Sequence, residues 1–183
     1  TEFQLLAVPG MREPLITDFA LSACESRFDA MLLMDIEEVA EGATLPTTDS
    51  SLPNVTNTIT RFRNRNLDSS FAAAYFPDVM IRDSGDDLNA LQTNQRRVRA
   101  PSSVVALGAL ARTDDVTQPW FAPAGFSRGS LPNVSSLDVR LNAADRDALY
   151  EAHINPIANF PVSNPGFVEY KIWGQKTLQE RKS

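Results

Sequence analysis

The sequence is poor in the residues from which common active sites are built. Its 183 residues include one cysteine, Cys24, and one histidine, His153. A single cysteine excludes an internal disulfide framework, and one residue of each kind is too few for a structural zinc site. A serine or cysteine nucleophile needs a base beside it, and no Gly-x-Ser-x-Gly motif accompanies His153. We therefore interpret Cys24 as a small buried residue and His153 as a structural one.

Other absences exclude broad functional classes. No apolar run approaches the roughly 18 residues of a membrane-spanning helix. The net charge of −6 gives no overall basic footprint for nucleic acid. The nucleotide-binding glycine motifs are missing, because Gly174-Gln175-Lys176-Thr177 ends in a Lys-Thr pair without the upstream glycine. The sequence thus predicts no cofactor, no metal, no nucleic-acid partner and no membrane insertion.

Lysine is also scarce, since 14 of the 17 basic residues are arginine. Arginine makes planar, bidentate contacts with carboxylates and is enriched at protein interfaces, so this bias favours protein–protein contact. Two arginine patches are the candidates: Arg61, Arg63 and Arg65, and Arg96, Arg97 and Arg99.

An acidic group follows one predicted strand. Asp35, Glu37 and Glu38 could hold a cation at the end of that strand, although such carboxylates are more often simply solvated.

The remaining composition is that of a globular domain. Hydrophobic residues make up 43% of the chain and charged residues 22%, enough for one domain with a core. Apolar runs and alternation predict strands over 3–8, 28–36, 70–76, 137–141 and 167–173. Periodicity and capping signals predict helices over about 14–26, 54–66, from Pro101 onward, and from Asn142 to about His153. Strands alternating with helices predict an α/β fold with a mostly parallel sheet flanked by helices.

The first predicted helix has an apolar stripe at helical spacing. Leu15, Ile16, Phe19, Ala20 and Ala23 form this stripe, and we expect it to face the core.

A stiff loop is predicted over 112–129. Its two prolines exclude a regular helix or a central strand, and its glycines permit unusual backbone angles. Trp120 and Phe121 bring a large apolar area that should be buried, which anchors the loop. With Pro123 and Gly125 they form the candidate structural loop, which we interpret as a rigid corner.

Several short motifs follow one another along nearly the whole chain, from about residue 15 to residue 178. Each is weak alone, but the ordered set resembles the contractile tail sheath proteins of bacteriophages. The motifs are Ala74-Tyr75-Phe76-Pro77, Pro101-Ser102-Ser103, Ala111-Arg112-Thr113-Asp114, Trp120-Phe121-Ala122-Pro123-Ala124-Gly125 with Arg128-Gly129, Asp147-x-Leu149-Tyr150, Ile154-Asn155-Pro156-Ile157 and Gly174-Gln175-Lys176-Thr177-Leu178.

The resemblance implies a single sheath core domain over 1–183, with a fold similar to subtilisin but without protease activity. Such subunits polymerise with one another around the tail tube, and a baseplate signal makes the sheath contract and drive the tube through the host envelope. The resemblance places the protein in the virion tail, and in the host cytoplasm during assembly. We expect the chain to be a piece that lacks an N-terminal arm and a C-terminal tube-binding domain, and to be monomeric in isolation.

Two alternatives stay open at this point. The sheath of a related contractile injection system, such as a pyocin-like particle or a type VI secretion apparatus, would share these motifs. A degenerate α/β hydrolase would instead need a nucleophile near His153.

Overall fold

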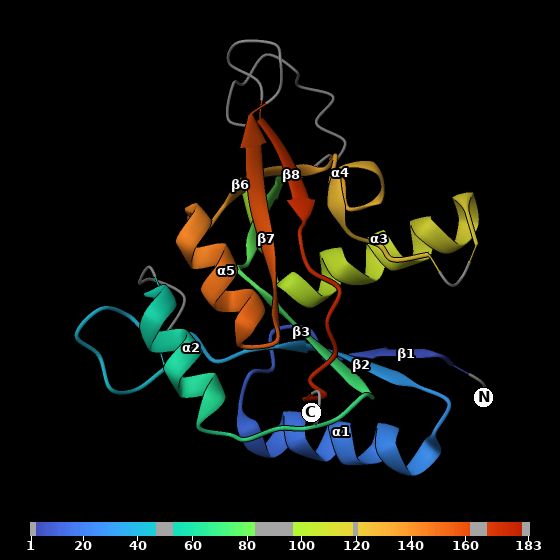
Figure 1. Cartoon of the computed structure of the whole chain (residues 1–183), viewed down its shortest axis with the longest axis vertical. Coiled ribbons are helices and arrows are strands. Elements are labelled where there is room, and N and C mark those ends of the chain that lie inside the picture. The colour runs from blue at the N-terminus through green and yellow to red at the C-terminus, as the bar shows by residue number, and fades with distance from the viewer. Residues whose placement is uncertain (1–2, 47–52, 83–96, 119–120, 162–167, 181–183) are drawn as a thin grey trace.

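The computed structural model describes residues 3–46, 53–82, 97–118, 121–161 and 168–180 (Figure 1). Two sheets and the helices packed on them make up this part of the chain. Within it, the helices are too short or too polar to cross a lipid bilayer.

The larger sheet has five strands in the order β1-β2-β3-β7-β8. Neighbouring strands are parallel from β1 through β7, and only β8 runs antiparallel to its neighbour β7. The middle strands are buried on both faces, which explains their nearly continuous apolar sequences. The strands are β1 (Leu5–Ala7), β2 (Met31–Asp35), β3 (Ala72–Phe76), β7 (Ile154–Pro161) and β8 (Val168–Ile172).

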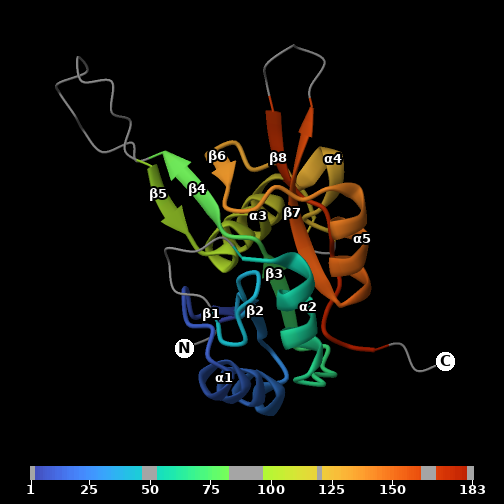
Figure 2. The same ribbon diagram turned by 90° about the vertical axis from the view of Figure 1, so that its left-hand side faces the viewer.

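The smaller sheet has three antiparallel strands in the order β5-β4-β6, and Figure 2 shows it beside the β7–β8 half of the larger sheet. Three of the six strand pairings in the described residues are therefore antiparallel. The predicted α/β class is confirmed, but the prediction of a mostly parallel sheet is wrong, because the arrangement is mixed. The strands are β4 (Val79–Arg82), β5 (Arg97–Ala100) and β6 (Val134–Leu137).

The helices cover both faces of the larger sheet. Alternate residues of β2 point to opposite faces, so Leu32 and Met34 join one core and Leu33 joins the other. Helices α1, α2 and α5 bury residues in the first core, and α3 buries Ala106 and Ala109 in the second. The helices are α1 (Pro14–Arg27), α2 (Val55–Arg63), α3 (Ser102–Val116), the short α4 (Gly125–Arg128) and α5 (Ala143–Glu151).

Most predicted elements are present, with some corrections to their bounds. The capping signal at Asn142 is confirmed, because its side chain and that of Asp145 each accept the other's backbone N–H. Strand β6 ends at Leu137, where the predicted strand began, and the sequence reading had no counterpart for β4. The cause is the same in both cases: the strands of a small sheet are so short that their apolar–polar alternation is too weak to predict a strand.

The predicted loop over 112–129 is shorter than expected, because α3 continues through Val116. Phe121 is 39% exposed and lies under the guanidinium of Arg128, so it is not a buried anchor. Pro123 is half-buried, and Gly125 opens α4 with a positive φ of 82°, a conformation that glycine adopts easily. Trp120 lies outside the described residues.

The predicted apolar stripe of α1 points largely away from the core. Leu15 and Phe19 are 78% and 77% exposed, whereas Thr17, Leu21 and Cys24 are buried. The prediction was wrong for Leu15 and Phe19 but right for Ala20, because α1 has apolar residues on both sides and packs Ala20, Leu21 and Cys24 into the core.

Replacing Phe19 with serine should therefore change the free energy of unfolding by less than about 0.5 kcal/mol, since exposed positions contribute little. Urea denaturation of both proteins measures the difference. Replacing a buried phenylalanine would lower the free energy of unfolding by about 3 kcal/mol or more. That result would contradict the exposed position of Phe19 on α1.

Candidate functional site

The carboxyl edge of the sheet, where α/β proteins usually bind ligands, is occupied in this protein by hydrogen-bonded side chains. Asp35 ends β2 at the carboxyl edge of the sheet, facing the first turn of α3. Its Oδ1 accepts from the Ser102 hydroxyl (2.9 Å) and the Ser103 backbone N–H (2.8 Å). Its Oδ2 accepts from the Ser103 hydroxyl (2.8 Å) and the Gly10 N–H (2.9 Å). All four bonds converge on one buried carboxylate.

This geometry replaces the helix cap that the sequence suggested. The sequence places the start of this helix at Pro101-Ser102-Ser103, but the N-cap position is Pro101, without a side-chain cap. Asp35 and Asp78 supply acceptors from other elements, and Asp78 Oδ1 accepts the Ser102 N–H at 3.2 Å. Negative charge at this end also suits the dipole of α3.

Beside Asp35 lies an arginine–carboxylate network formed by Arg12, Glu38, Asp78, Arg99 and Asp138. Glu38 bridges both arginines, with distances of 2.6 Å to Arg12 Nη1 and 2.8 Å to Arg99 Nη2. Arg99 Nε lies 3.0 Å from Asp78 and 2.6 Å from Asp138, and Arg12 also pairs with Asp78. The network therefore joins the segment after β1 to strand β5 and to the segments that follow β2, β3 and β6.

Burial shapes the electrostatics of this network. Glu38 and Asp78 are 4% and 3% exposed. Burial raises the pKa of Asp78 above its ordinary value, although the neighbouring Arg12 and Arg99 oppose this effect. Moving these charges out of water costs free energy. Each buried carboxylate is therefore stable in its position only while its arginine partners are present.

The arrangement offers no reactive pair. The two serine hydroxyls donate to Asp35, and the chain's one histidine lies elsewhere, where Nδ1 donates to the Thr177 carbonyl at 3.0 Å. His153 borders an open pocket of about 1020 Å³, but among the described residues no hydrogen bond joins it to a serine or cysteine side chain. Within the same residues, no group of His, Cys, Asp and Glu side chains is arranged to hold a metal ion.

The acidic group after β2 has other roles than the sequence suggested. Glu37 pairs with Arg61 at 2.9 Å, Glu38 belongs to the network, and Asp35 caps α3. All three are buried rather than solvated. Sequence reasoning missed Arg12, Asp78 and Asp138, since nothing in their spacing marks residues from distant segments as neighbours.

The candidate contact arginines fall into two groups. Arg61, Arg65 and Arg99 pair with carboxylates of the same chain, Arg65 doing so with Asp18 while its side chain is only 8% exposed. Arg63 and Arg97 are exposed and form no ion pair with the described residues. Arg96 lies outside the described part of the chain.

The segment Gly174-Gln175-Lys176-Thr177-Leu178 is held by one buried amide. The Asn155 side chain accepts the Lys176 N–H at 2.7 Å and donates to the Lys176 carbonyl at 2.8 Å. A Cβ on Gly174 would lie 2.7 Å from Asn155 Oδ1 and 3.0 Å from its Cα. The close approach of the two backbones thus requires glycine at 174.

Changing Gly174 to alanine should cost about 2 kcal/mol of stability, because the added methyl group forces Asn155 and this segment apart. Thermal unfolding followed by circular dichroism measures the loss. Gly108→Ala is the matched control, since a Cβ at 108 meets nothing within 4 Å and its helical position favours alanine. Equal effects of the two changes would contradict this account.

Fold and site together define an α/β domain whose usual ligand position is closed by salt bridges and hydrogen bonds. No family model matches the chain. It is 43% identical over 90 residues to a tail sheath protein of Vibrio phage KVP40, covering 49% of this chain and 13% of that protein. It is 34% identical over 114 residues to the tail sheath protein of Enterobacteria phage T4, covering 62% and 15%. The resemblance to tail sheath proteins is thereby confirmed.

The matched part of the chain covers only about one seventh of the length of these relatives. A solved chain in the cryo-electron microscopy structure of the anti-feeding prophage baseplate has the same fold, with a TM-score of 0.61 at 20% identity. That similarity covers 97% of this chain and 38% of the other.

Proposed function

We propose that this chain is part of a structural subunit of a contractile phage tail sheath. The subunit polymerises around the tail tube and contracts to drive the tube through the host envelope. The observation that carries the proposal is the 43% identity to a phage tail sheath protein over half of the chain. The same likeness supports a non-enzymatic role. So does the carboxyl edge of the sheet, where the Asp35 carboxylate is fully occupied by hydrogen bonds from Gly10 and α3.

Within this proposal, residues 1–183 form one core domain similar to the subtilisin-like domain of sheath proteins. A network that ties five segments together suits a domain that moves as a rigid body during contraction. Its partners are further sheath subunits, the tail tube protein and the baseplate. Its place is the virion tail, after assembly in the host cytoplasm.

The sheath of a related contractile injection system, such as a pyocin or a type VI secretion apparatus, is the alternative. The anti-feeding prophage chain of similar fold supports it, but at 20% identity that likeness concerns the fold alone. Both relatives above 30% identity are phage tail sheath proteins, which favours the phage tail.

Immunogold electron microscopy tests the proposal. Antibodies raised against the purified chain should label the outer shaft of the tail, along its whole length, on particles made by the organism that encodes the protein. Labelling only at the baseplate or head, or on no particle, would refute the sheath role. Labelling of tails that lack a phage head would favour the injection-system alternative.

The exposed arginines give a second test. Arg63→Glu or Arg97→Glu in the sheath protein should reduce the yield of full-length sheaths about tenfold, because reversed charge at an interface repels its partner. Arg61→Glu is not a clean control, since it also breaks the pair with Glu37. Arg140→Glu is better suited, because Arg140 is exposed, forms no ion pair with the described residues and lies outside both patches. Normal sheaths from both interface variants would exclude these arginines from subunit contacts.

A further inference from the structure

The outer side of α1 presents an apolar surface with nothing packed on it among the described residues. Leu15 and Phe19 lie one helical turn apart and are 78% and 77% exposed. Ile16 beside them is 36% exposed, and Ser22 continues the same side. We call Leu15, Ile16, Phe19 and Ser22 the α1 outer face. Contiguous exposed apolar residues of this kind mark interaction sites.

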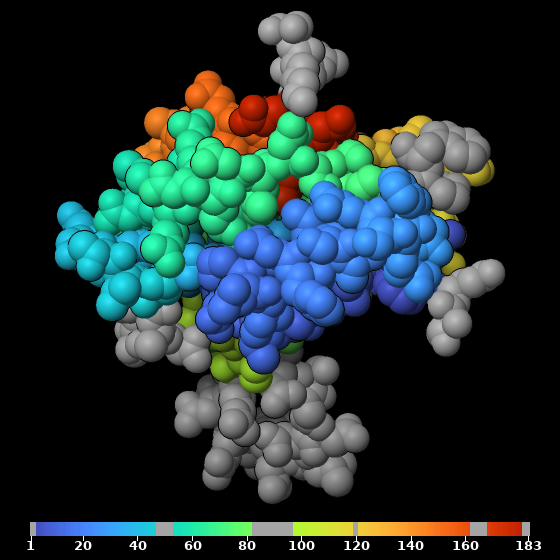
Figure 3. All heavy atoms as spheres, turned by 90° about the horizontal axis from the view of Figure 1, so that it is seen from below, coloured from blue at the N-terminus to red at the C-terminus, as the bar shows by residue number. Residues whose placement is uncertain are grey.

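Carboxylates border the α1 outer face. Glu13 precedes the helix, and Asp18 and Glu25 lie along its flank. Asp18 is neutralised by Arg65, whereas Glu13 and Glu25 form no ion pair with the described residues. The space-filling view from below shows α1 lying across the open surface of this side of the molecule (Figure 3). The face is thus apolar with an acidic border.

A second apolar surface lies where α4 meets the β7–β8 hairpin. Phe126, Phe160 and Trp173 pack against one another with ring centroids 4.7–5.2 Å apart. Phe126 is 62% exposed and Trp173 is 36% exposed, so the cluster forms an open aromatic platform. Large rigid aromatic side chains are the residues that contribute most at protein interfaces.

The border of the aromatic platform is basic. The Arg146 guanidinium lies 5.1 Å from the centroid of Phe160, and Arg128, two residues after Phe126 in α4, lies 3.9 Å from the centroid of Phe121. Neither arginine forms an ion pair with the described residues, whereas Lys171, over Phe126, pairs with Glu169. The platform therefore has the opposite charge border to that of the α1 outer face.

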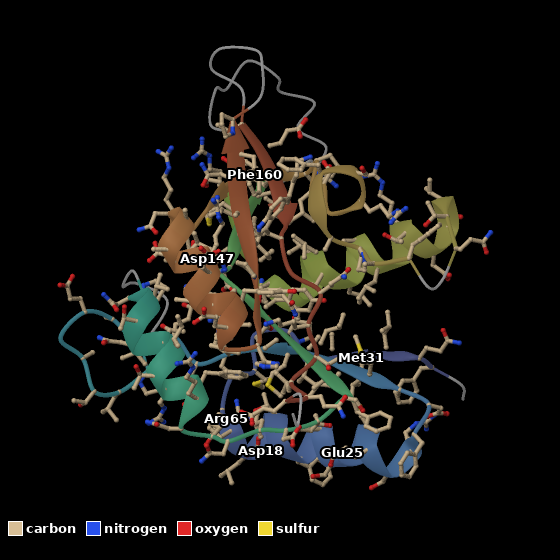
Figure 4. The ribbon with its side chains drawn as sticks, viewed as in Figure 1. Asp18, Glu25, Met31, Arg65, Asp147 and Phe160 are labelled. Carbon is tan, nitrogen blue, oxygen red and sulfur yellow. The ribbon has the colours of Figure 1, made fainter. Side chains whose placement is uncertain are left out.

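The two surfaces cannot meet within one chain. Figure 4 shows Asp18 and Glu25 on α1 at the lower end of the molecule and Phe160 near the upper end of β7. We propose that the α1 outer face of one copy packs on the aromatic platform of the next copy. Apolar surface meets apolar surface in this contact, and Glu13 and Glu25 approach Arg128 and Arg146. This charge complementarity favours pairing unlike surfaces over pairing like ones.

Such a contact is heterologous, because each copy offers a different surface to each neighbour. A repeated contact of this kind continues into an open helical polymer unless its rotation closes a ring. The inference rests on the proposed sheath function and identifies which surfaces would join successive subunits.

Disulfide trapping tests the contact, because it also captures a contact too weak to hold the isolated chain together. Ser22 belongs to the α1 outer face, Ser127 follows Phe126 of the aromatic platform, and both are exposed, whereas the native Cys24 is fully buried and remains unlinked. We expect a mixture of the Ser22→Cys and Ser127→Cys proteins, oxidised with copper phenanthroline, to form mainly the mixed dimer. Linkage of Ser22→Cys only to itself would indicate a two-fold contact through α1 and overturn the proposal. Absence of any linkage would overturn it as well.

Surface variants sharpen this test. Phe19→Ser or Phe126→Ser should lower the initial rate of mixed-dimer formation about tenfold, which corresponds to about 1.4 kcal/mol of contact energy. Leu45→Ser removes an equally exposed leucine (71%) outside both surfaces and should leave the rate unchanged. Equal rates in all three variants would refute the contact. Tail labelling by the antibodies would still support the sheath function in that case, so the two failures are distinguishable.

Discussion

Replacing Asp35 with alanine should lower the free energy of unfolding by about 4 kcal/mol. The carboxylate accepts from two backbone N–H groups and two hydroxyls, those of Ser102 and Ser103, and all but the Gly10 bond lie in the buried interior. Hydrogen bonds to a charged group contribute about 1.5–3 kcal/mol each, and every donor left unpaired in the interior carries its own desolvation cost. The hydroxyls can turn toward other acceptors, which keeps the total below a simple sum.

Equilibrium unfolding in urea measures this loss. Asp29→Ala is the control, since Asp29 is half exposed and, among the described residues, pairs only with the exposed Arg27, and it should cost less than about 1 kcal/mol. Asp35→Asn adds information about charge. Its amide retains one acceptor oxygen but points N–H groups at donors, so it should recover little of the loss. Full recovery in Asp35→Asn, or equal losses at 35 and 29, would contradict the capping role of Asp35.

The sequence indicated the core of the sheet well, because β2 and β3 are short apolar runs bounded by turn residues. Leu32, Leu33 and Met34 read as a strand covered on both faces, and each face has its own core. It indicated α1 but not its orientation. Leu15 and Phe19 are exposed, whereas Ala20, Leu21 and Cys24 are buried in the core. The hydrophobicity of the residues alone does not show which apolar side of a helix packs against the sheet.

The polar site was less accessible to prediction. Asp35, Glu37 and Glu38 were recognised as a group, but their partners come from residues 10 to 103 of the chain. Charge pairs between distant segments leave no periodic trace, so Arg99 read as part of an exposed patch like its neighbour Arg97. In the fold, Arg97 and Arg99 lie on the same face of β5, but Arg99 lies nearer the end of the strand, where its guanidinium reaches Asp78 and Asp138. The motif-based resemblance succeeded because it does not depend on such contacts.

Replacing Arg99 with methionine should cost about 4 kcal/mol at neutral pH. Methionine keeps the aliphatic volume but removes one of the cations that pair with the buried Glu38 and Asp78, and removing one partner of a buried ion pair typically costs about 3–5 kcal/mol. Arg97→Met is the matched control, since Arg97 lies two residues away on the same strand and is exposed. It should change stability by less than about 0.5 kcal/mol.

Acidification distinguishes lost charge pairing from lost packing in Arg99→Met. Burial already raises the folded-state pKa of Asp78, and Arg99 is one of two cations that oppose the rise, so its removal raises that pKa further. A carboxyl group with a raised folded-state pKa binds its proton more tightly in the folded than in the unfolded chain. The variant therefore gains stability relative to the wild type as pH falls from neutrality toward the ordinary value of 3.8. We expect the difference in unfolding free energy to narrow over this range in urea titrations at successive pH values. If the difference in unfolding free energy between wild type and Arg99→Met stays constant with pH, the lost stability comes from packing. The burial of a side chain's apolar atoms does not depend on the binding of protons.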